Sequence, residues 1–507
     1  MSRKIHLPEW AGSQVLFQRA YQFRQRIAAP VQAIPVDLFR ISAALVVFGY
    51  LVRLFIEAPL FHTKDGLLDH QIIRDVFWFT SQPLFSETHP LWLTQGWIAL
   101  AGILTLGIII GWHPRKCAFG AYVIVVCSIR HRFLIVSVDD VIIHLLLFWL
   151  FVLPIGTTLT LRRGNDPARE QLVPGGAVRL FACNIALIYF VAGISKWGSE
   201  MWLNGSALFA IMSVRPGWFS NVITLDWLPP LQVLNYLALL IEPFLAVIPF
   251  LRTGHGIKKL LGLLLVGLHV FIIASLDVVF ANLGCMATLP ILFREELMRH
   301  TSRSLPDTGR WRSIDTFAAV VLIFIFGAMT CSLTQRNWRK PSAENKLAEL
   351  EKDLPSMAGG PEQLFFFGGL WMVGLIQQYR LLDWIDDRNF AVRVHIEETL
   401  DSGPSYEVHE YALVPPGMRS SLTLSYLLGA TWLPIPPDQM PDLRYSILKG
   451  LAHRYAQSSD QNGRITVMVT RYRITPYIPK KPPKPKLLME FRCKNGSAHI
   501  DSMNLNL

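Results

Sequence analysis

Long apolar stretches recur between residues 38 and 333, and short polar connections separate them. A helix needs about 20 mostly apolar residues to cross the hydrocarbon core of a bilayer. The pattern predicts eight or nine membrane-spanning helices, at residues 38–58, 89–111, 116–135, 138–160, 179–196, 229–251, 260–277, 278–293 and 314–333. The count stays open because the eighth stretch is short and follows the seventh closely.

After about residue 340, apolar and polar residues alternate, which is typical of half-buried strands. The alternating segments are AVRVHIEETL, YEVHEYALV, ITVMVTRYRI and KLLMEFRC, and LRYSILKGLAHRYAQ (residues 443–457) has the spacing of an amphipathic helix. The proline-rich PYIPKKPPKPK (residues 476–486) cannot be a central strand, so we expect an exposed basic loop there. The expected architecture is an α-helical polytopic membrane domain over residues 38–335, followed by a smaller α+β, β-rich soluble domain over residues 340–507.

The composition agrees with a membrane protein. Of 507 residues, 51% are hydrophobic and 17% are charged, whereas soluble domains average about 25% charged residues. The net charge of +11 does not indicate a nucleic-acid partner, because excess Lys and Arg in short loops mark the cytoplasmic side of polytopic proteins. Basic residues occupy the amino-terminal arm and every second connection. We therefore expect a cytoplasmic amino terminus and, with nine crossings, an extracytoplasmic C-terminal domain.

The arm of residues 1–37 lacks the apolar core of a signal peptide, so we expect no cleavable leader. Three arginines, Arg19, Arg24 and Arg26, alternate with apolar residues in this arm. The arm therefore reads as an interfacial helix on an anionic leaflet, or as an amphipathic helix packed on the protein. The six cysteines are scattered without a CxxC motif, so the sequence predicts no metal site and no disulfide framework.

Ionisable side chains inside membrane spans are costly, and they mark either a function or a specific pairing. With the expected orientation, many of them fall in the outer half of four different spans. These are Arg53, Arg130, His131, Arg132, Asp139, Asp140, His144 and Lys196, while Glu242 and His269 lie deeper, near the middle of the membrane. This convergence predicts a polar pocket on the outer side.

Several of these residues also have purely structural interpretations. Arg130 and Arg132 could form ion pairs with Asp139 and Asp140 at a helical hairpin. His144 and His269 could be considered as metal ligands, but they lack a carboxylate at ligand spacing.

Two further contacts are expected to be structural. Glu242 could accept a hydrogen bond from an arginine such as Arg53, and His269 could be a satisfied intramembrane histidine. Asp37 and Arg40 are expected to form a contact at the start of the first span.

Lys196 has two competing interpretations. Trp197 and Trp202 flank it like an interfacial aromatic belt, so the lysine could be an anchor that extends toward the headgroups. A lysine withdrawn from water can instead remain a neutral amine and act as a general base. A base that faces an apolar cavity would suit a lipidic acid such as a quinol.

The stretch LIYFVAGISKWGSEMWLNGSALFAIMS, together with DLFRI, SIRHRF…VDD and HVFIIASLDVVFANLGCMATLPILF, resembles the HTTM domain. This is the membrane domain shared by vitamin K-dependent γ-carboxylase and its bacterial relatives, and the resemblance covers about residues 35–300. It implies nine spans, a bacterial inner-membrane location and an extracytoplasmic C-terminal domain. It also implies that Lys196 aligns with the catalytic lysine, which deprotonates a vitamin K-like quinol before reaction with O2 and CO2.

The chain departs from the family pattern at three places. Ser195 replaces the first of two adjacent lysines, Asp139 and Asp140 lie near the position of an Asn-Asn-His motif, and the C-terminal domain is shorter than in the animal enzyme. Quinol chemistry at a lysine therefore transfers better than protein carboxylation. The competing hypothesis is a non-catalytic membrane subunit that binds lipid or a protein partner through the C-terminal domain; transport is a third, for which the sequence lacks a repeat of broken helices. The sequence leaves the oligomeric state open.

Overall fold

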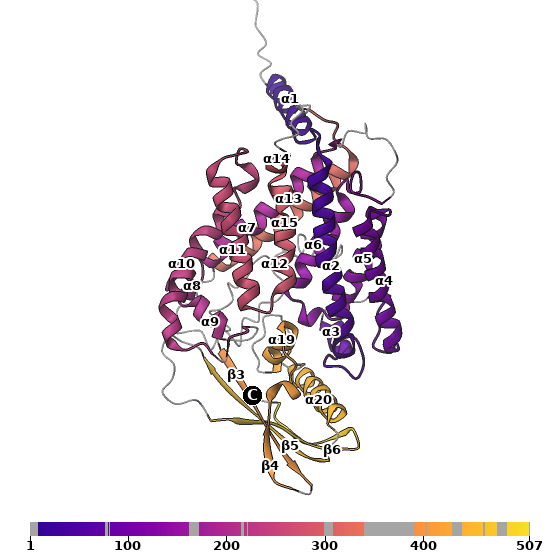
Figure 1. Cartoon of the computed structure of the whole chain (residues 1–507), viewed down its shortest axis with the longest axis vertical. Helices are drawn as coiled ribbons and strands as arrows, with labels where there is room; N and C mark the ends of the chain where they lie inside the picture. Colours follow the sequence, from indigo (N-terminus) through magenta and orange to yellow (C-terminus); the bar gives the residue numbers. More distant parts are fainter. Residues whose placement is uncertain are drawn as a thin grey trace, which may run out of the picture.

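A helical bundle carries a smaller β-sheet domain at one end in the computed structural model (Figure 1). The structure describes residues 9–76, 80, 82–161, 172–213, 217–220, 222–298, 308–338, 390–401, 403–427, 439–459, 462–473 and 484–505. The bundle end next to the sheet is called the domain end below. The opposite end carries α1 (Glu9–Ile27) and is called the arm end.

Six helices of the described chain are long and apolar enough to cross a membrane. They are α2 (Ala33–Phe61), α4 (Leu91–Ile110), α7 (Gly176–Lys196), α10 (Leu228–Leu245, extended by short helical turns to residues 225–250), α11 (Gly256–Ser275) and α15 (Ser313–Trp338). Each coincides with a predicted span, so the helical, membrane-type character of this region is confirmed.

The other three predicted spans are also helical but shorter or charged. Residues 116–135 form α5 (Pro114–His131), whose basic residues at both ends lower its hydropathy. Residues 138–160 contain only α6 (Val138–Val152), because Pro154 follows directly after its C-cap. Residues 278–293 are divided into α12 (Val279–Ala287) and α13 (Leu289–Leu292). The number of crossings, eight or nine, therefore stays a prediction.

The C-terminal domain contains a five-stranded antiparallel sheet in the order β4-β3-β5-β6-β7. The strands are β3 (Phe390–Leu400), β4 (Ser405–Val408), β5 (Gly463–Arg473), β6 (Lys486–Lys494) and β7 (Ser497–Met503), and the helices are α19 (Met418–Leu427) and α20 (Met440–Ser458).

The sequence predictions for β3, β5, β6 and α20 are confirmed. YEVHEYALV was expected to be one strand, but only its start belongs to β4, and a 3-10 turn follows at Glu410–Ala412. Neither α19 nor β7 was predicted from the sequence. Most of the expected basic loop at residues 476–486 lies outside the described residues.

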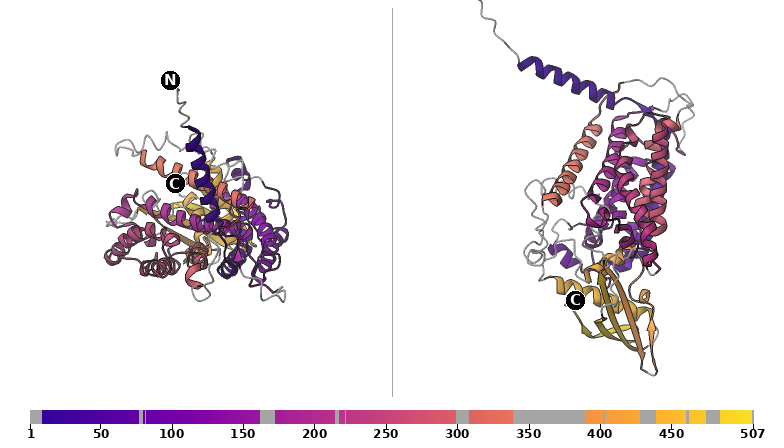
Figure 2. Two further views of the ribbon diagram at one scale, coloured as in Figure 1. Left: turned by 90° about the horizontal axis from the view of Figure 1, so that it is seen from above. Right: turned by 90° about the vertical axis from the view of Figure 1, so that its left-hand side faces the viewer.

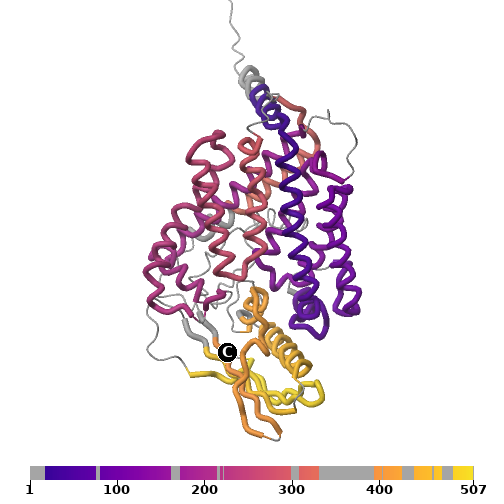
Figure 3. The backbone as a smooth tube through the Cα atoms, in the orientation of Figure 1, coloured from indigo at the N-terminus to yellow at the C-terminus, as the bar shows by residue number. Residues whose placement is uncertain are grey.

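One hydrophobic core joins the C-terminal domain to the bundle. Ile396, Leu448 and Phe491 of the domain belong to the same buried cluster as Phe61 and Ile135 of the bundle. Figure 2 and Figure 3 show the sheet and α20 directly beyond the ends of the bundle helices. Because residues of both the domain and the bundle are buried there, the junction is a continuous hydrophobic core and not a surface contact.

Shorter elements complete the chain. A two-residue ladder pairs β1 (Val31–Gln32) with β2 (Leu172–Val173), and Arg179 donates hydrogen bonds to the carbonyls of Ile27 and Ala29, which together fix the start of α2. The remaining described helices are α3 (His70–Val76), α8 (Glu200–Leu203), α9 (Ala207–Ser213) and α14 (Arg294–Leu297). α1 extends away from the bundle at the arm end (Figure 2).

Candidate functional site

A buried ion pair connects Lys196, the last residue of α7, with Glu242 of α10. The Lys196 Nζ lies 2.5 Å from Glu242 Oε2 and donates a second hydrogen bond, of 3.0 Å, to the carbonyl of Ala192. The ammonium also lies 5.4 Å from the centre of the Trp202 ring, within the range of a cation–π interaction. The Lys196 side chain is 3% exposed and that of Glu242 is 10% exposed. A lysine in this position does not extend to the headgroups, so the anchor interpretation does not fit the geometry.

Close packing of α7 and α10 brings the two partners together. Gly193 faces Pro243 so tightly that an added Cβ would lie 2.5 Å from the proline Cδ. No larger residue fits there without moving backbone or ring atoms. Lys196 is about one turn beyond Gly193, and Glu242 directly precedes Pro243, so this contact sets the distance between amine and carboxylate.

A chain of hydrogen bonds begins on the same face of α7. Tyr189 precedes Lys196 by seven residues, which is two helical turns, and its hydroxyl lies 2.7 Å from His269 Nε2. His269 Nδ1 lies 2.6 Å from Asn282 Oδ1, whose amide nitrogen donates to the Val278 carbonyl. Because Asn282 Oδ1 can only accept, His269 Nδ1 donates to it, and in a neutral imidazole Nε2 then accepts from Tyr189. Both ring nitrogens of His269 are thus hydrogen-bonded inside the bundle.

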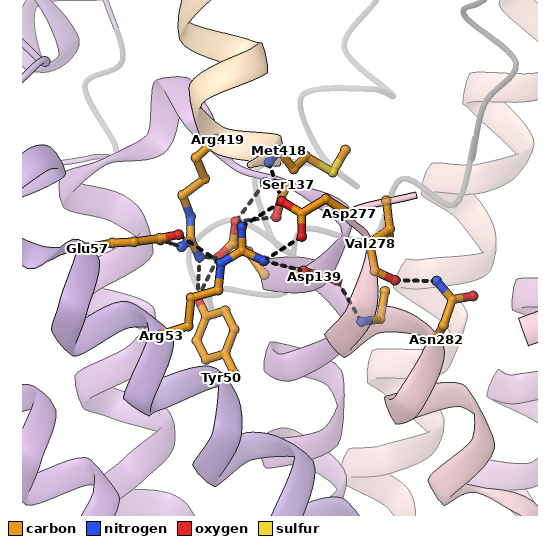
Figure 4. Close-up of polar contacts among 12 residues, drawn as sticks. Tyr50, Arg53, Glu57, Ser137, Asp139, Asp277, Val278, Asn282, Met418 and Arg419 are labelled. Carbon is orange, nitrogen blue, oxygen red and sulfur yellow. Dashed lines mark hydrogen bonds and ion pairs between the residues drawn. The ribbon is translucent and has the colours of Figure 1, made fainter. Parts of the chain in front are cut away.

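A second polar group, the domain-end ionic cluster, is separate from the lysine. It consists of Arg53 and Glu57 of α2, Arg132, Asp139 and Asp140 around the start of α6, Asp277 before α12, and Arg419 of α19. Figure 4 labels Arg53, Glu57, Asp139, Asp277 and Arg419 of this cluster. Ser137 caps α6, and its N–H and hydroxyl both donate to Asp140 in a capping box. Local sequence therefore places Asp140 at the first turn of α6.

Asp140 is the centre of this cluster. Arg132 and Arg419 lie 2.6 Å and 3.0 Å from its Oδ1, and the Tyr50 hydroxyl donates to the same oxygen. Arg132 also donates to the Tyr50 oxygen at 2.6 Å. The expected hairpin ion pair between Arg132 and Asp140 is thus confirmed, and all of these side chains are buried.

Arg53 organises the other half of the cluster. It pairs with Glu57 at 2.8 Å and with Asp277 at 3.0 Å, and it lies 3.9 Å from Asp139. The prediction that Arg53 could bind Glu242 is wrong, because Arg53 is held by these carboxylates. Asp139 in turn accepts the backbone N–H of Ala281 at 2.7 Å.

Three histidines stack next to this cluster. The rings of His70 and His131 are parallel with centroids 3.8 Å apart, and His62 lies 5.7 Å from His131. Burial lowers the pKa of His70, which keeps it neutral. His131 therefore belongs to a structural stack at the junction with the C-terminal domain.

The remaining predicted residues are dispersed. His144 is buried on α6 with its ring 6.0 Å from that of Tyr122 and does not meet His269, which binds Tyr189. Trp197 is 50% exposed and donates to the Leu239 carbonyl, whereas Trp202 is buried. Arg130 lies in the last turn of α5 and is partly buried. The structure thus divides the expected single pocket into two polar centres.

Six residues of the two polar centres were not predicted from the sequence: Tyr50, Glu57, Asp277, Arg419, Tyr189 and Asn282. Tyr189 carried a signal, since it shares a helical face with Lys196. Arg419 carried none, because the segment around it has no pattern of charge.

Asp37 and Arg40 lie at the arm end. Their expected contact is confirmed at 3.2 Å, but it is part of a larger arrangement. Asp37 accepts four backbone N–H groups from residues 156–159, and Arg40 donates to carbonyls of residues 108, 109 and 159. Together they hold the connections after α4 and α6 against the start of α2.

Within the described part of the chain, no three His, Cys, Asp or Glu side chains are arranged to hold a metal ion. No family model matches the chain, and no curated protein or solved structure is significantly similar to it. The site therefore has to be interpreted from its own geometry.

Proposed function

We propose that the chain is an integral membrane enzyme of the vitamin K-dependent γ-carboxylase-like class, in which Lys196 and Glu242 act as an acid–base pair on a quinol-like lipid. The observation that carries this proposal is the buried contact of 2.5 Å between the amine and the carboxylate. Within such a pair, one proton has two alternative positions, Nζ of Lys196 and Oε2 of Glu242.

Burial favours proton chemistry at this pair. In the proposed mechanism, Glu242 takes the proton of Lys196 as the quinol binds, which leaves a neutral amine beside the substrate. In the neutral form, the amine of Lys196 can accept the proton of an acidic hydroxyl. The Ala192 carbonyl and the Trp202 ring then stabilise the ammonium that forms.

The surroundings fit a lipidic substrate. Leu240 and Phe244 of α10 are exposed apolar residues on the side of the helix opposite Glu242, and they would contact acyl chains. Glu242 is the more accessible partner of the pair, since 10% of its side chain is exposed. A substrate arriving from the bilayer would therefore meet the carboxylate first. The resemblance assigns O2 and CO2 as co-substrates of the chemistry that follows the proton transfer.

The proposal includes nine crossings, with the amino terminus in the cytoplasm and the C-terminal domain outside. Basic residues at the arm end support this orientation. α5, α6 and the α12–α13 pair would complete the six longer helices, since each runs within the bundle (Figure 1). The Tyr21 and Phe23 side chains of α1 are exposed beside its arginines, which suits contact with an anionic leaflet.

The test compares Lys196→Met with Lys258→Met, a matched control. Lys258 is also 3% exposed, pairs with Glu296 at 3.0 Å and lies over the Phe293 ring, but it is on another helix. In lipid nanodiscs supplied with a reduced prenylated naphthoquinone, the wild type is expected to consume oxygen. Lys196→Met should lower that rate at least about 100-fold, as loss of a general base does, while Lys258→Met retains it.

The competing function is a non-catalytic lipid-binding subunit. Mass spectrometry of lipids that copurify with the wild type separates the two, because a bound quinone supports the enzyme. Equal oxygen consumption by wild type and Lys196→Met, at equal protein yield, would refute the base role of Lys196.

A further inference from the structure

Arg419 of the C-terminal domain extends its side chain into the domain-end ionic cluster. Its guanidinium forms ion pairs with Glu57 of α2 and Asp140 of α6, and it lies 5.6 Å from the centre of the Tyr50 ring. The Arg419 side chain is 4% exposed. An arginine that is buried between two helices of another domain is more than a surface contact.

The two residues before Arg419 also touch the bundle. The Met418 N–H donates to Asp277 Oδ2 at 2.8 Å, and Met418 packs against the bundle core. Gly417 adopts a φ of 128°, and a Cβ there would lie 3.1 Å from both Arg53 and Asp277. Only glycine combines this backbone conformation with so close an approach. The start of α19 is therefore shaped to fit the cluster.

The carboxylates that hold α19 also hold the start of α12. Asp277 is two residues before α12, and Asp139 accepts the Ala281 N–H in its first turn. The next residue, Asn282, fixes the orientation of His269. A continuous set of contacts therefore runs from α19 through Asp277 and Arg53 to α12 (Figure 4).

The formal charge of the domain-end ionic cluster explains why these contacts depend on α19. Without Arg419 the cluster has two arginines (Arg53 and Arg132) against four carboxylates (Glu57, Asp139, Asp140 and Asp277), a formal charge of −2, and Arg419 reduces it to −1. Buried carboxylates that lose a cation repel one another, and Asp277 and Asp139 are the two that bind α19 and α12.

We propose that α19 is a clamp through which the C-terminal domain fixes the first turn of α12, with Arg419 as the positioning residue. While α19 is docked, Asn282 holds His269 toward Tyr189. When α19 withdraws, the first turn of α12 loosens and this orientation is released. The inference does not depend on the chemistry proposed for Lys196.

Hydrogen exchange of the full chain in nanodiscs tests the clamp. Arg419→Gln should raise amide exchange of residues 279–284 at least about tenfold, the change expected when a charge-assisted hydrogen bond is lost. The sheet strands β3, β5 and β6 are held by their own backbone ladders, which do not involve Arg419, so they should retain their protection. Arg419→Lys keeps the charge and should show a smaller rise.

Two further variants keep the test decisive. Gly417→Ala disturbs the approach of α19 without removing a charge and should also raise exchange in α12. Arg464→Gln is the matched control, because Arg464 pairs with Glu490 at 2.9 Å on the exposed side of the sheet; it should leave α12 unchanged. Loss of protection in α19 with α12 unchanged would overturn the clamp, as would equal loss in α12 and the sheet. Oxygen consumption is not needed for either outcome, so failure of the clamp is distinguishable from failure of the proposed function.

Discussion

The two polar centres of the bundle each contain a buried carboxylate, but the two carboxylates differ in how many hydrogen-bond donors they have. Asp140 has Arg132, Arg419, Tyr50 and Ser137 as hydrogen-bond donors, so its oxygens are fully occupied. Glu242 has Lys196 as its one hydrogen-bond donor in the described chain. A carboxylate whose lone pairs are all engaged is held in one position by its partners, whereas one with a single partner has lone pairs left for another donor. The first centre is therefore structural, and the second is the one for which we propose chemistry.

The largest loss of stability should follow from a substitution in the domain-end ionic cluster. Asp140→Asn leaves two buried guanidinium groups without their shared carboxylate, and we expect a loss of about 3–5 kcal/mol in the free energy of unfolding. Thermal unfolding in detergent would measure it as a large drop in Tm. The C-terminal domain should undock in the same step, because Arg419 loses a partner.

Asp501→Asn is the matched control for that substitution. Asp501 pairs with Arg492 at 3.1 Å, and the arginine side chain is 68% exposed. Such a pair contributes at most about 1 kcal/mol. A similar Tm for both variants would show that the domain-end ionic cluster is not a stabilising centre.

A double-mutant cycle on the Lys196–Glu242 pair should give the next largest loss of stability. Lys196→Met leaves Glu242 without its partner, but 10% of the Glu242 side chain is exposed, so we expect a loss of only about 2 kcal/mol in unfolding free energy. Glu242→Gln should cost a similar amount, because it leaves a buried ammonium. The double variant should recover part of the loss, with a coupling energy of about 2 kcal/mol. Additive losses would mean that the two side chains do not interact.

The comparison also separates what the sequence could predict from what it could not. Alternation in β3 and β5 and the spacing in α20 are local, so these elements were predicted correctly. Charged residues of the first spans were correctly expected to gather. Their partners were not, because whether Arg53 meets Glu242 or Asp277 depends on how helices pack.

Two elements were missed for identifiable physical reasons. The segment of α19 is rich in Ser and Thr, which do not favour helices in isolation, and its burial against the bundle overrides that preference. β7 is an edge strand, and its alternation of polar and apolar residues is short, from Ser497 to Asp501, with the small Ala498 as one of its two apolar residues. The early end of α6 was visible in the sequence as Pro154, but the apolar residues beyond it extended the prediction.

The finest comparison uses one tyrosine from each centre. Tyr50 donates to Asp140 and accepts from Arg132, whereas Tyr189 donates to His269. Replacement by Phe removes only the hydroxyl, so each lost hydrogen bond should lower the free energy of unfolding by about 1 kcal/mol. Tyr50→Phe should therefore shift Tm more than Tyr189→Phe, and it alone should raise hydrogen exchange in α19. If Tyr189→Phe loosened α19 to the same extent, the two centres would be one coupled unit, and structural and chemical roles could no longer be assigned to them separately.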